Sequence, residues 1–185
     1  MIRTVMKRLL FIQFIFLPVF LFGQCDLLPS STTHEVVKHT YYTLSFSKRD
    51  EQTEWVAYLL TRSMLTGQSE MGNNFRPDIS IPNGSAQLSN YNKSGYDRGY
   101  LCPAGDMTFS DQAMSETFIL SNMSPQVPAF NRGIWKSVET LVRECAEGND
   151  SIYIVTGGIL SESKGSIGVD RVTPSKFYKV IHDLT

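Results

Sequence analysis

The chain has 185 residues, 42% hydrophobic and 11% aromatic, which suffices to bury one sizeable core and form one domain. Its 17 basic and 18 acidic residues give a formal net charge of −1. This balance argues against a broadly cationic surface for nucleic acid, unless the basic side chains gather in one groove.

The N-terminus has the pattern of an export signal. Arg3, Lys7 and Arg8 precede an apolar run over residues 9–22, which is short for a membrane span. We therefore expect residues 1–24 to be a cleaved signal peptide rather than a retained anchor, and the protein to be secreted or periplasmic without a stable membrane span. Cleavage removes three basic residues and leaves 14 against 18 acidic ones, a net charge of −4.

The next part of the chain favours strands followed by a loop. "HTYYTLSF" places Tyr42, Leu44 and Phe46 on one face of a strand by strict alternation. "TEWVAYLL" fits either a strand or a helix. Residues 67–84 are rich in Gly, Asn and Pro, have no period and predict a long surface loop.

One helix is predicted over residues 131–148, and two β-rich runs follow it. The apolar positions of the helix recur at helical spacing, and its other face is expected to be polar. The apolar face comprises Ile134, Val138, Leu141, Val142 and Cys145, and the polar face Asn131, Lys136, Glu139, Arg143 and Glu147. "SIYIV" and "KFYKVI" are strand-like. Strands and a helix without a regular βαβ rhythm predict an α+β fold with a mostly antiparallel sheet.

An ordered set of polar residues runs through the second half of the chain. Asp97, Arg98 and Gly99 alone would suggest only a turn. They are followed by "LSNMSPQ" over residues 120–126, and then by Asn131, Glu139 and Arg143 at steps of eight and four residues.

This set resembles the DNA/RNA non-specific endonucleases, whose fold belongs to the ββα-metal class. The resemblance extends from Tyr42 to Ile181 and includes "SGYDRG" and "FYKV". It implies an endonuclease-like domain over residues 41–185 after an N-terminal extension over residues 25–40. Family members generally continue beyond the strand that resembles "FYKVI", so two alternatives are open: the last elements are dispensable, or the domain is C-terminally truncated.

The resemblance also implies roles for single residues. Asn131 matches the only protein ligand of a hydrated Mg²⁺, for which Mn²⁺ is the alternative, and Glu139 matches the residue that holds the metal's waters. Asn122, Arg98 and Arg143 match residues that orient the site and the phosphate of DNA or RNA. Asp97 opens the short motif and has an orienting role.

Elementary chemistry agrees with these roles. Mg²⁺ prefers hard oxygen ligands and keeps several waters, so one amide oxygen and a nearby carboxylate make a reasonable site. Guanidinium groups stabilise the charge that develops on a phosphate during cleavage. The alternative for Glu139 and Arg143, which are four residues apart on a helix, is a solvated salt bridge.

Tyr100 departs from the family pattern, because it stands where the family has the histidine that acts as general base. A phenol has a reference pKa near 10, against about 6.5 for imidazole. Loss of a general base typically costs about 10²–10⁴ in rate. The other histidines, His34, His39 and His182, match no motif and are expected to be ordinary surface or strand residues.

Two functions remain open from the sequence. The first is Mg²⁺-dependent, sequence-nonspecific cleavage of DNA or RNA, impaired by Tyr100, with water activated by the metal or by a tyrosinate. The second is a catalytically inactive relative that binds nucleic acid or a protein partner.

Overall fold

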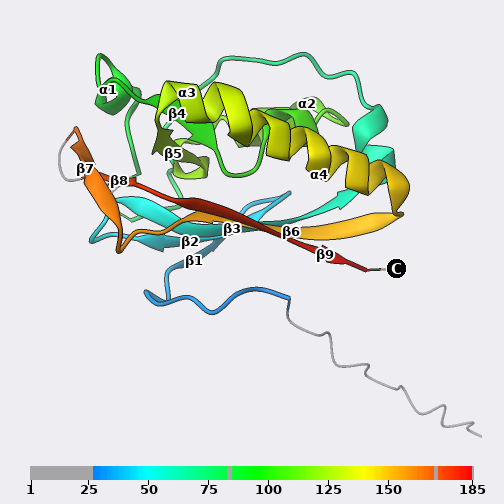
Figure 1. Ribbon diagram of the computed structural model, residues 1–185, viewed down its shortest axis with the longest axis horizontal. Helices are drawn as coiled ribbons and strands as arrows, with labels where there is room; N and C mark the ends of the chain where they lie inside the picture. The colour runs from blue at the N-terminus through cyan, green and yellow to red at the C-terminus, as the bar shows by residue number, and fades with distance from the viewer. Residues whose placement is uncertain (1–26, 83–84, 169–170, 185) are drawn as a thin grey trace, which may run out of the picture.

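A five-stranded antiparallel sheet carries the fold in the computed structural model, which describes residues 27–82, 85–168 and 171–184 (Figure 1). The expected signal peptide lies outside the described residues. The strand order is β1, β2, β3, β6, β9. The strands are β1 (Val36–Lys38), β2 (Thr43–Ser47), β3 (Gln52–Thr61), β6 (Ser151–Gly158) and β9 (Phe177–Asp183). The expected antiparallel sheet is thus confirmed, and β1 lies within the segment expected to be an N-terminal extension.

A second layer of helices and short strands covers one face of this sheet (Figure 1). Its helices are α1 (Leu88–Tyr91), α2 (Asp111–Thr117), α3 (Pro128–Phe130) and α4 (Lys136–Gly148), joined by 3₁₀ turns at Arg62–Thr66, Ala104–Asp106 and Leu120–Asn122. A π turn over Asn131–Trp135 links α3 to α4. Its strands are the pair β4 (Asp97–Tyr100) and β5 (Met123–Gln126), and a further pair, β7 (Ser163–Ile167) and β8 (Arg171–Pro174), lies at one end of the large sheet (Figure 1). No helix of the described residues is long and apolar enough to cross a membrane.

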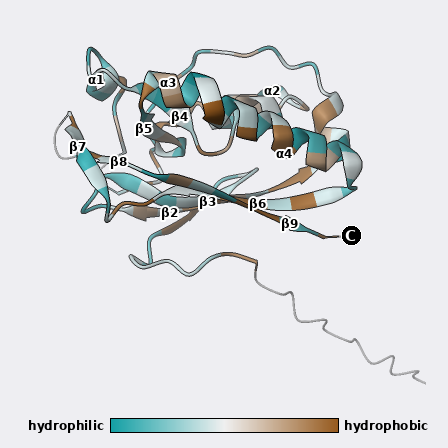
Figure 2. Ribbon diagram, viewed as in Figure 1, coloured by the Kyte–Doolittle hydropathy of each residue, from teal (hydrophilic) through white to brown (hydrophobic). Residues whose placement is uncertain are grey.

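The main core lies between the sheet and α4, and strand alternation explains its composition. Tyr42, Leu44 and Phe46 are all buried, as predicted from their spacing. "TEWVAYLL" is strand, because β3 pairs with β2 on one side and β6 on the other. Val56, Tyr58 and Leu60 of β3, Ile152 and Ile154 of β6, and Val142 and Ala146 of α4 share one buried cluster. In Figure 2 α4 carries both brown and teal segments, as an amphipathic helix does.

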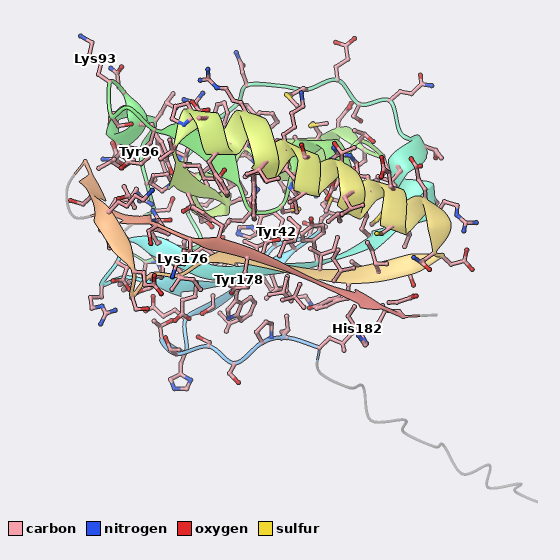
Figure 3. The ribbon with its side chains drawn as sticks, viewed as in Figure 1. Tyr42, Lys93, Tyr96, Lys176, Tyr178 and His182 are labelled. Carbon is pink, nitrogen blue, oxygen red and sulfur yellow. The ribbon has the colours of Figure 1, made fainter. Side chains whose placement is uncertain are left out.

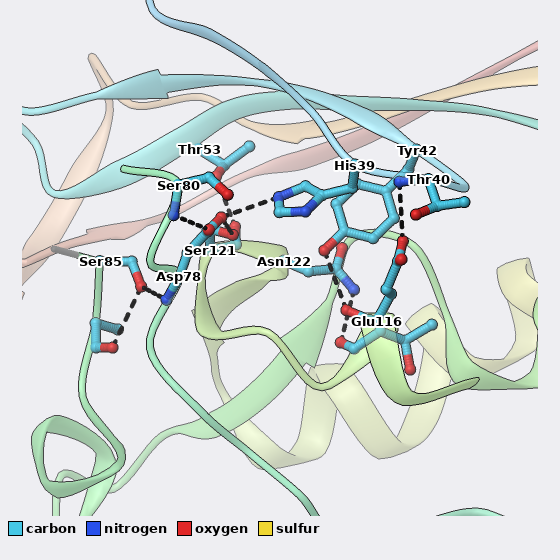
Figure 4. A network of polar contacts seen from close by, with 12 residues as sticks. His39, Thr40, Tyr42, Thr53, Asp78, Ser80, Ser85, Glu116, Ser121 and Asn122 are labelled. Atoms are coloured by element: carbon cyan, nitrogen blue, oxygen red, sulfur yellow. Dashed lines mark hydrogen bonds and ion pairs between the residues drawn. The ribbon is translucent and has the colours of Figure 1, made fainter. Parts of the chain in front are cut away.

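The loop that follows the 3₁₀ turn after β3 is attached to the rest of the fold by the buried carboxylate of Asp78 (Figure 4). Its oxygens accept hydrogen bonds from the His39 Nε2 atom at 3.0 Å, the Ser121 hydroxyl at 2.5 Å and the Ser80 backbone N–H at 2.9 Å. The His39 side chain is 8% exposed, so the expectation of an ordinary surface or strand histidine is wrong for this residue. The Asp78 carboxylate therefore joins its own loop to two segments that are distant in sequence, those of His39 and Ser121.

Asp78→Asn should destabilise the fold by about 3 kcal/mol at neutral pH, because it weakens three hydrogen bonds to a buried charge. Burial alone would raise the pKa of Asp78, but the bonds from His39 and Ser121 outweigh it and the pKa lies below its usual range. The carboxylate's contribution is therefore present above about pH 4 and is lost as the pH falls through the folded pKa. In urea unfolding, the difference in free energy of unfolding between wild type and Asp78→Asn should narrow in acid. The exposed substitution Asp150→Asn should change that free energy little at any pH.

Candidate active site

Two short strands and a helix position the polar set that the sequence singles out. Asp97 pairs with Gln126 in the β4–β5 ladder, so the start of β4 lies beside the end of β5, where the chain turns into α3. Gly99 is required there, because a Cβ atom at this position would overlap the side chain of Gln126. The π turn that holds Asn131 follows directly, and such turns are frequent at functional sites.

The Asp97 carboxylate connects β4 to this turn. It accepts hydrogen bonds from Arg132 Nε at 2.8 Å and Nη2 at 2.7 Å, and from the Asn131 amide Nδ2 at 3.1 Å. The hydrogen bond from Arg132, assisted by that from Asn131, lowers the pKa of Asp97 against the opposing effect of burial. With its amide nitrogen held by Asp97, Asn131 keeps an oxygen that accepts no hydrogen bond from any described residue.

Arg98 places a guanidinium group in the same cleft. The cleft has a volume of about 310 Å³, and its lining includes Asp97, Arg98, Tyr100 and Asn131. The Arg98 Cζ atom lies 4.1 Å from the centre of the Phe75 ring. Among the described residues this guanidinium has no hydrogen-bond acceptor and no ion-pair partner. The cleft therefore offers a free cationic donor group beside a free amide oxygen.

Tyr100 lies in the wall of the cleft as an aromatic packing residue. Its ring contacts those of Phe118 and Phe75, with centroid distances of 5.9 and 6.4 Å. Burial raises its pKa to about 12; the charge of Arg98 opposes this shift and that of Glu139 adds to it. The phenol is therefore protonated at neutral pH, which disfavours the tyrosinate considered from the sequence.

The predicted apolar face of the helix packs only in part, with Val138, Val142 and Cys145 against the core as expected. Ile134 and Leu141, expected to pack, are 63% and 56% exposed. Glu139 and Arg143, expected on the polar face, are partly buried on the side that carries Val142. The prediction was wrong for these four residues, because apolar spacing alone does not reveal that the helix also directs two charged side chains inward.

The inward charges of α4 belong to a buried polar cluster between helix and sheet, formed by Asp106, Glu139, Arg143 and Lys179. Arg143 Nη1 donates to Asp106 Oδ1 at 3.0 Å, and the Tyr58 hydroxyl donates to Asp106 Oδ2 at 2.8 Å. Lys179 Nζ donates to Thr156 Oγ1 at 2.7 Å. Arg143 therefore binds a buried carboxylate and is not among the residues that line the cleft with Asn131.

Glu139 is the least compensated member of this buried cluster. It accepts no hydrogen bond from any described residue. Burial raises its pKa to about 7, although the charges of Lys179 and Arg143 oppose the shift. Strongly shifted carboxyl groups beside a cleft are typical of functional sites. Glu139 does not line the cleft itself, but its charge influences Tyr100, which does.

Asn122 has a different environment from the other expected site residues, because it is fully buried. Its Oδ1 atom accepts from the Cys102 N–H at 2.8 Å, and its Nδ2 atom donates to the carbonyl oxygens of Cys102 and Thr117, both at 2.9 Å. These three bonds fix the segment that follows β4. Asn122 thus positions the site from behind and does not line the cleft.

Sequence reasoning missed several residues that build this site. Arg132 follows Asn131 directly, and Lys179 stands in the apolar strand "FYKVI", where a lysine is itself unusual. Phe75 and Asp106 carried no comparable signal. Their roles depend on contacts between segments far apart in the chain.

Comparison with known proteins agrees with this arrangement. A family model for DNA/RNA non-specific endonucleases matches residues 27–185. The chain belongs to this family. Nuclease C1 of Cunninghamella echinulata var. echinulata is 34% identical over 165 residues, which cover 81% of this chain and 66% of that protein. The mitochondrial nuclease EXOG of Danio rerio is 36% identical over 156 residues, 77% of this chain and 46% of that protein.

A solved structure confirms the fold of this endonuclease family member. A chain in the crystal structure of the EndoG/EndoGI complex superposes with a TM-score of 0.73 at 32% identity, covering 80% of this chain and 67% of that one. The α+β, ββα-metal fold expected from the sequence is thereby confirmed. The chain spans between 43% and 66% of the length of three curated relatives that it matches.

The cleft of this endonuclease-like domain suits a hydrated hard cation. The described residues contain no group of three or more His, Cys, Asp or Glu side chains that could hold a metal ion. The available metal ligand is the Asn131 amide oxygen, whose orientation Asp97 fixes. One neutral oxygen ligand is compatible with Mg²⁺, which dehydrates reluctantly and keeps most of its waters. The residues present therefore fit such an ion.

Asn122→Ala should destabilise the protein by about 3 kcal/mol, since it leaves a buried N–H and two buried carbonyl groups without partners. Urea unfolding monitored by circular dichroism measures the loss. Asn73→Ala, at an exposed position, is the matched control and should stay within about 0.5 kcal/mol of wild type. A fully stable Asn122→Ala protein would show that the three bonds do not hold this segment.

Glu139→Gln should stabilise the protein at pH 8 by about 1–2 kcal/mol, a value reduced for the residue's partial exposure. The folded pKa of Glu139, about 7, is above that of an unfolded glutamate, about 4.3. The favourable contribution of the protonated Glu139 carboxyl to the free energy of unfolding is therefore present below about pH 4 and is lost as the pH rises through 7. Thermal unfolding from pH 5 to pH 8 should show this loss in wild type and in exposed Glu144→Gln, but not in Glu139→Gln.

Proposed function

We propose that this protein hydrolyses phosphodiester bonds of DNA or RNA without sequence specificity, at the cleft that Asp97, Arg98, Tyr100 and Asn131 line. The observation that carries the proposal is the free guanidinium of Arg98 beside the free amide oxygen of Asn131 in one cleft. Membership of a nuclease family supports the reaction class. Mg²⁺ is the proposed cofactor, with Mn²⁺ as the alternative, and Asn131 is its proposed ligand.

Arg98 would bind the scissile phosphate. A guanidinium pairs with phosphate oxygens through two parallel hydrogen bonds, and these strengthen as negative charge develops in the transition state. The Phe75 ring beneath Arg98 restricts where the guanidinium can lie. When bound, Mg²⁺ supplies Lewis-acid stabilisation of the phosphate and a more acidic water.

Asp97 and Arg132 would act on Asn131 rather than on substrate. Their bidentate pair holds the carboxylate that receives the Asn131 amide, so the ligand oxygen is oriented before the ion arrives. Glu139 is proposed to orient the waters around the ion, and its influence on the pKa of Tyr100 supports a location near the reacting groups. Arg143 is proposed to act through Asp106, as a positioning residue.

Tyr100 limits the proposed reaction. Its pKa of about 12 leaves the hydroxyl protonated at neutral pH, so it can donate a hydrogen bond but cannot accept the proton of an attacking water. We therefore propose that hydrolysis is slow. The same observation favours the second candidate function, a catalytically inactive protein that binds nucleic acid or a protein partner.

Export is proposed on the N-terminal sequence alone. The basic residues ahead of the apolar run 9–22 support a signal over residues 1–24 and a secreted or periplasmic protein. The domain division at residue 41 is likewise a proposal from the resemblance.

Tyr100→His should raise cleavage by roughly 10²–10⁴, the usual effect of a general base. Nicking of supercoiled plasmid with Mg²⁺, with an EDTA control, measures the gain. Adding Asn131→Ala to the Tyr100→His protein should abolish the gain, because the imidazole acts only on water and phosphate that the rest of the site positions. Tyr178→Phe, on the sheet away from the cleft, is the matched tyrosine control.

Two outcomes would decide against parts of this proposal. Wild-type cleavage as fast as that of Tyr100→His, with a rate rising steeply at high pH, would mean that a tyrosinate does act as the base. A Tyr100→His protein that folds and binds DNA but stays inert would establish the inactive binding protein as the better function.

A further inference from the structure

A second pocket adjoins the candidate active cleft. It has a volume of about 480 Å³ and is lined by Leu88, Ser89, Tyr91, Asn92, Lys93 and Arg98. Tyr91 and Arg98 also line the first cleft, so the two hollows share a wall. The pocket lies at α1 and the turn after it, which none of the roles assigned above involves.

The shared wall contains two buried hydrogen-bond donors without acceptors. Tyr91 is 5% exposed, and neither its hydroxyl nor the Nε atom of Arg98 has a partner among the described residues. Unpaired buried donors are rare in folded proteins, and each costs free energy, so two of them among the residues that line both pockets indicate a ligand or ordered water. Burial raises the pKa of Tyr91, which keeps its hydroxyl a donor.

The charge around the two pockets is positive although the protein as a whole is acidic. Their lining includes three cations, Lys93, Arg98 and Arg132, and one anion, Asp97. Asp97 is already paired with Arg132. Lys93 is exposed, extends from the turn after α1 (Figure 3) and has no ion-pair partner in the described part of the chain. A ligand for this pocket should therefore be an anion.

We propose that this second pocket binds the backbone phosphate that neighbours the scissile one, through Lys93, Arg98 and the Tyr91 hydroxyl. The proposal rests on the proposed nuclease function for the identity of its ligand, a phosphodiester of a nucleic-acid strand. A strand carries a phosphate at every nucleotide, and Arg98 forms part of both pockets, so one guanidinium contacts two successive linkages. Leu88, 46% exposed at the rim, offers an apolar surface to the intervening sugar.

This arrangement explains how an acidic protein can hold a polyanion. Binding would depend on a few aligned cations in one groove instead of on the average charge of the surface. Lys93 adds a positive charge that gives up no ion-pair partner among the described residues when it binds a phosphate. Tyr91 adds an uncharged donor whose effect does not depend on salt.

The test measures binding of a fluorescein-labelled single-stranded DNA by fluorescence anisotropy in EDTA, over a series of salt concentrations. Lys93→Gln should weaken binding and reduce the slope of log affinity against log salt by about 0.7, the value for one phosphate contact on a single strand. Tyr91→Phe should weaken binding about 10-fold, the effect of one hydrogen bond to a charged group, without changing the slope. Lys38→Gln and Tyr178→Phe are the matched controls and should change neither quantity.

The outcome separates this proposal from the nuclease proposal. An unchanged slope in Lys93→Gln overturns the second pocket, even if Tyr100→His cleaves plasmid. A reduced slope supports the pocket even if Tyr100→His is inert, in which case only hydrolysis is lost. Equal losses in Lys38→Gln and Lys93→Gln would overturn the pocket in favour of diffuse attraction. Circular dichroism of Tyr91→Phe establishes that any loss is not one of folding.

Discussion

The carboxylate of Asp97 is the interaction on which the site depends. It joins the first strand of the β4–β5 pair to the turn that begins the helix, through Arg132 and Asn131. A charged acceptor with three donors forms stronger and more directional bonds than a neutral one, so the strand and the turn keep one relative position. Asp97 is also the one acidic side chain among the described residues that line the cleft. Because it is paired with Arg132, it does not compete with phosphate for Arg98.

A second constraint acts behind the cleft, where α4 packs on the sheet through charges as well as apolar groups. Asp106 accepts hydrogen bonds from Arg143 and Tyr58, and Lys179 donates to Thr156 and to the Leu101 carbonyl. Trp135 extends the connection to the motif, since its Nε1 atom donates to the Tyr100 carbonyl at 3.4 Å and Lys179 lies 5.3 Å from its ring. Buried charges are costly unless paired, so the helix packs on the sheet in the one position that keeps these pairs. Glu139 is the exception, because its partly buried carboxylate accepts no hydrogen bond from any described residue.

Tyr100 shows that a site can keep its architecture while its chemistry changes. The ring is accommodated by Phe75 and Phe118, and its backbone keeps its place in the β4–β5 ladder. The same aromatic surroundings hold the phenol in its neutral form. Packing thus stabilises the substitution and at the same time disfavours the ionised state that proton transfer would need.

The sequence by itself determined the fold class, the family and the order of the polar residues along the chain. Alternation identified the face of Tyr42, Leu44 and Phe46, because the strand period follows from local geometry. The resemblance to the family lay in the identity and order of Asp97, Asn131, Glu139 and Arg143, which a linear sequence records in full, and the family model confirms it.

Only the tertiary structure decided which of those residues share a cleft. Asp97, Arg98, Tyr100 and Asn131 line it together, whereas Asn122 is buried behind it and Arg143 is bound to Asp106. Helical periodicity located α4 and the packing of Val138, Val142 and Cys145, but it missed the exposure of Leu141. Hydropathy ranks side chains by their average behaviour, and the partners that make it favourable to bury Arg143 and Lys179 come from segments distant in the chain.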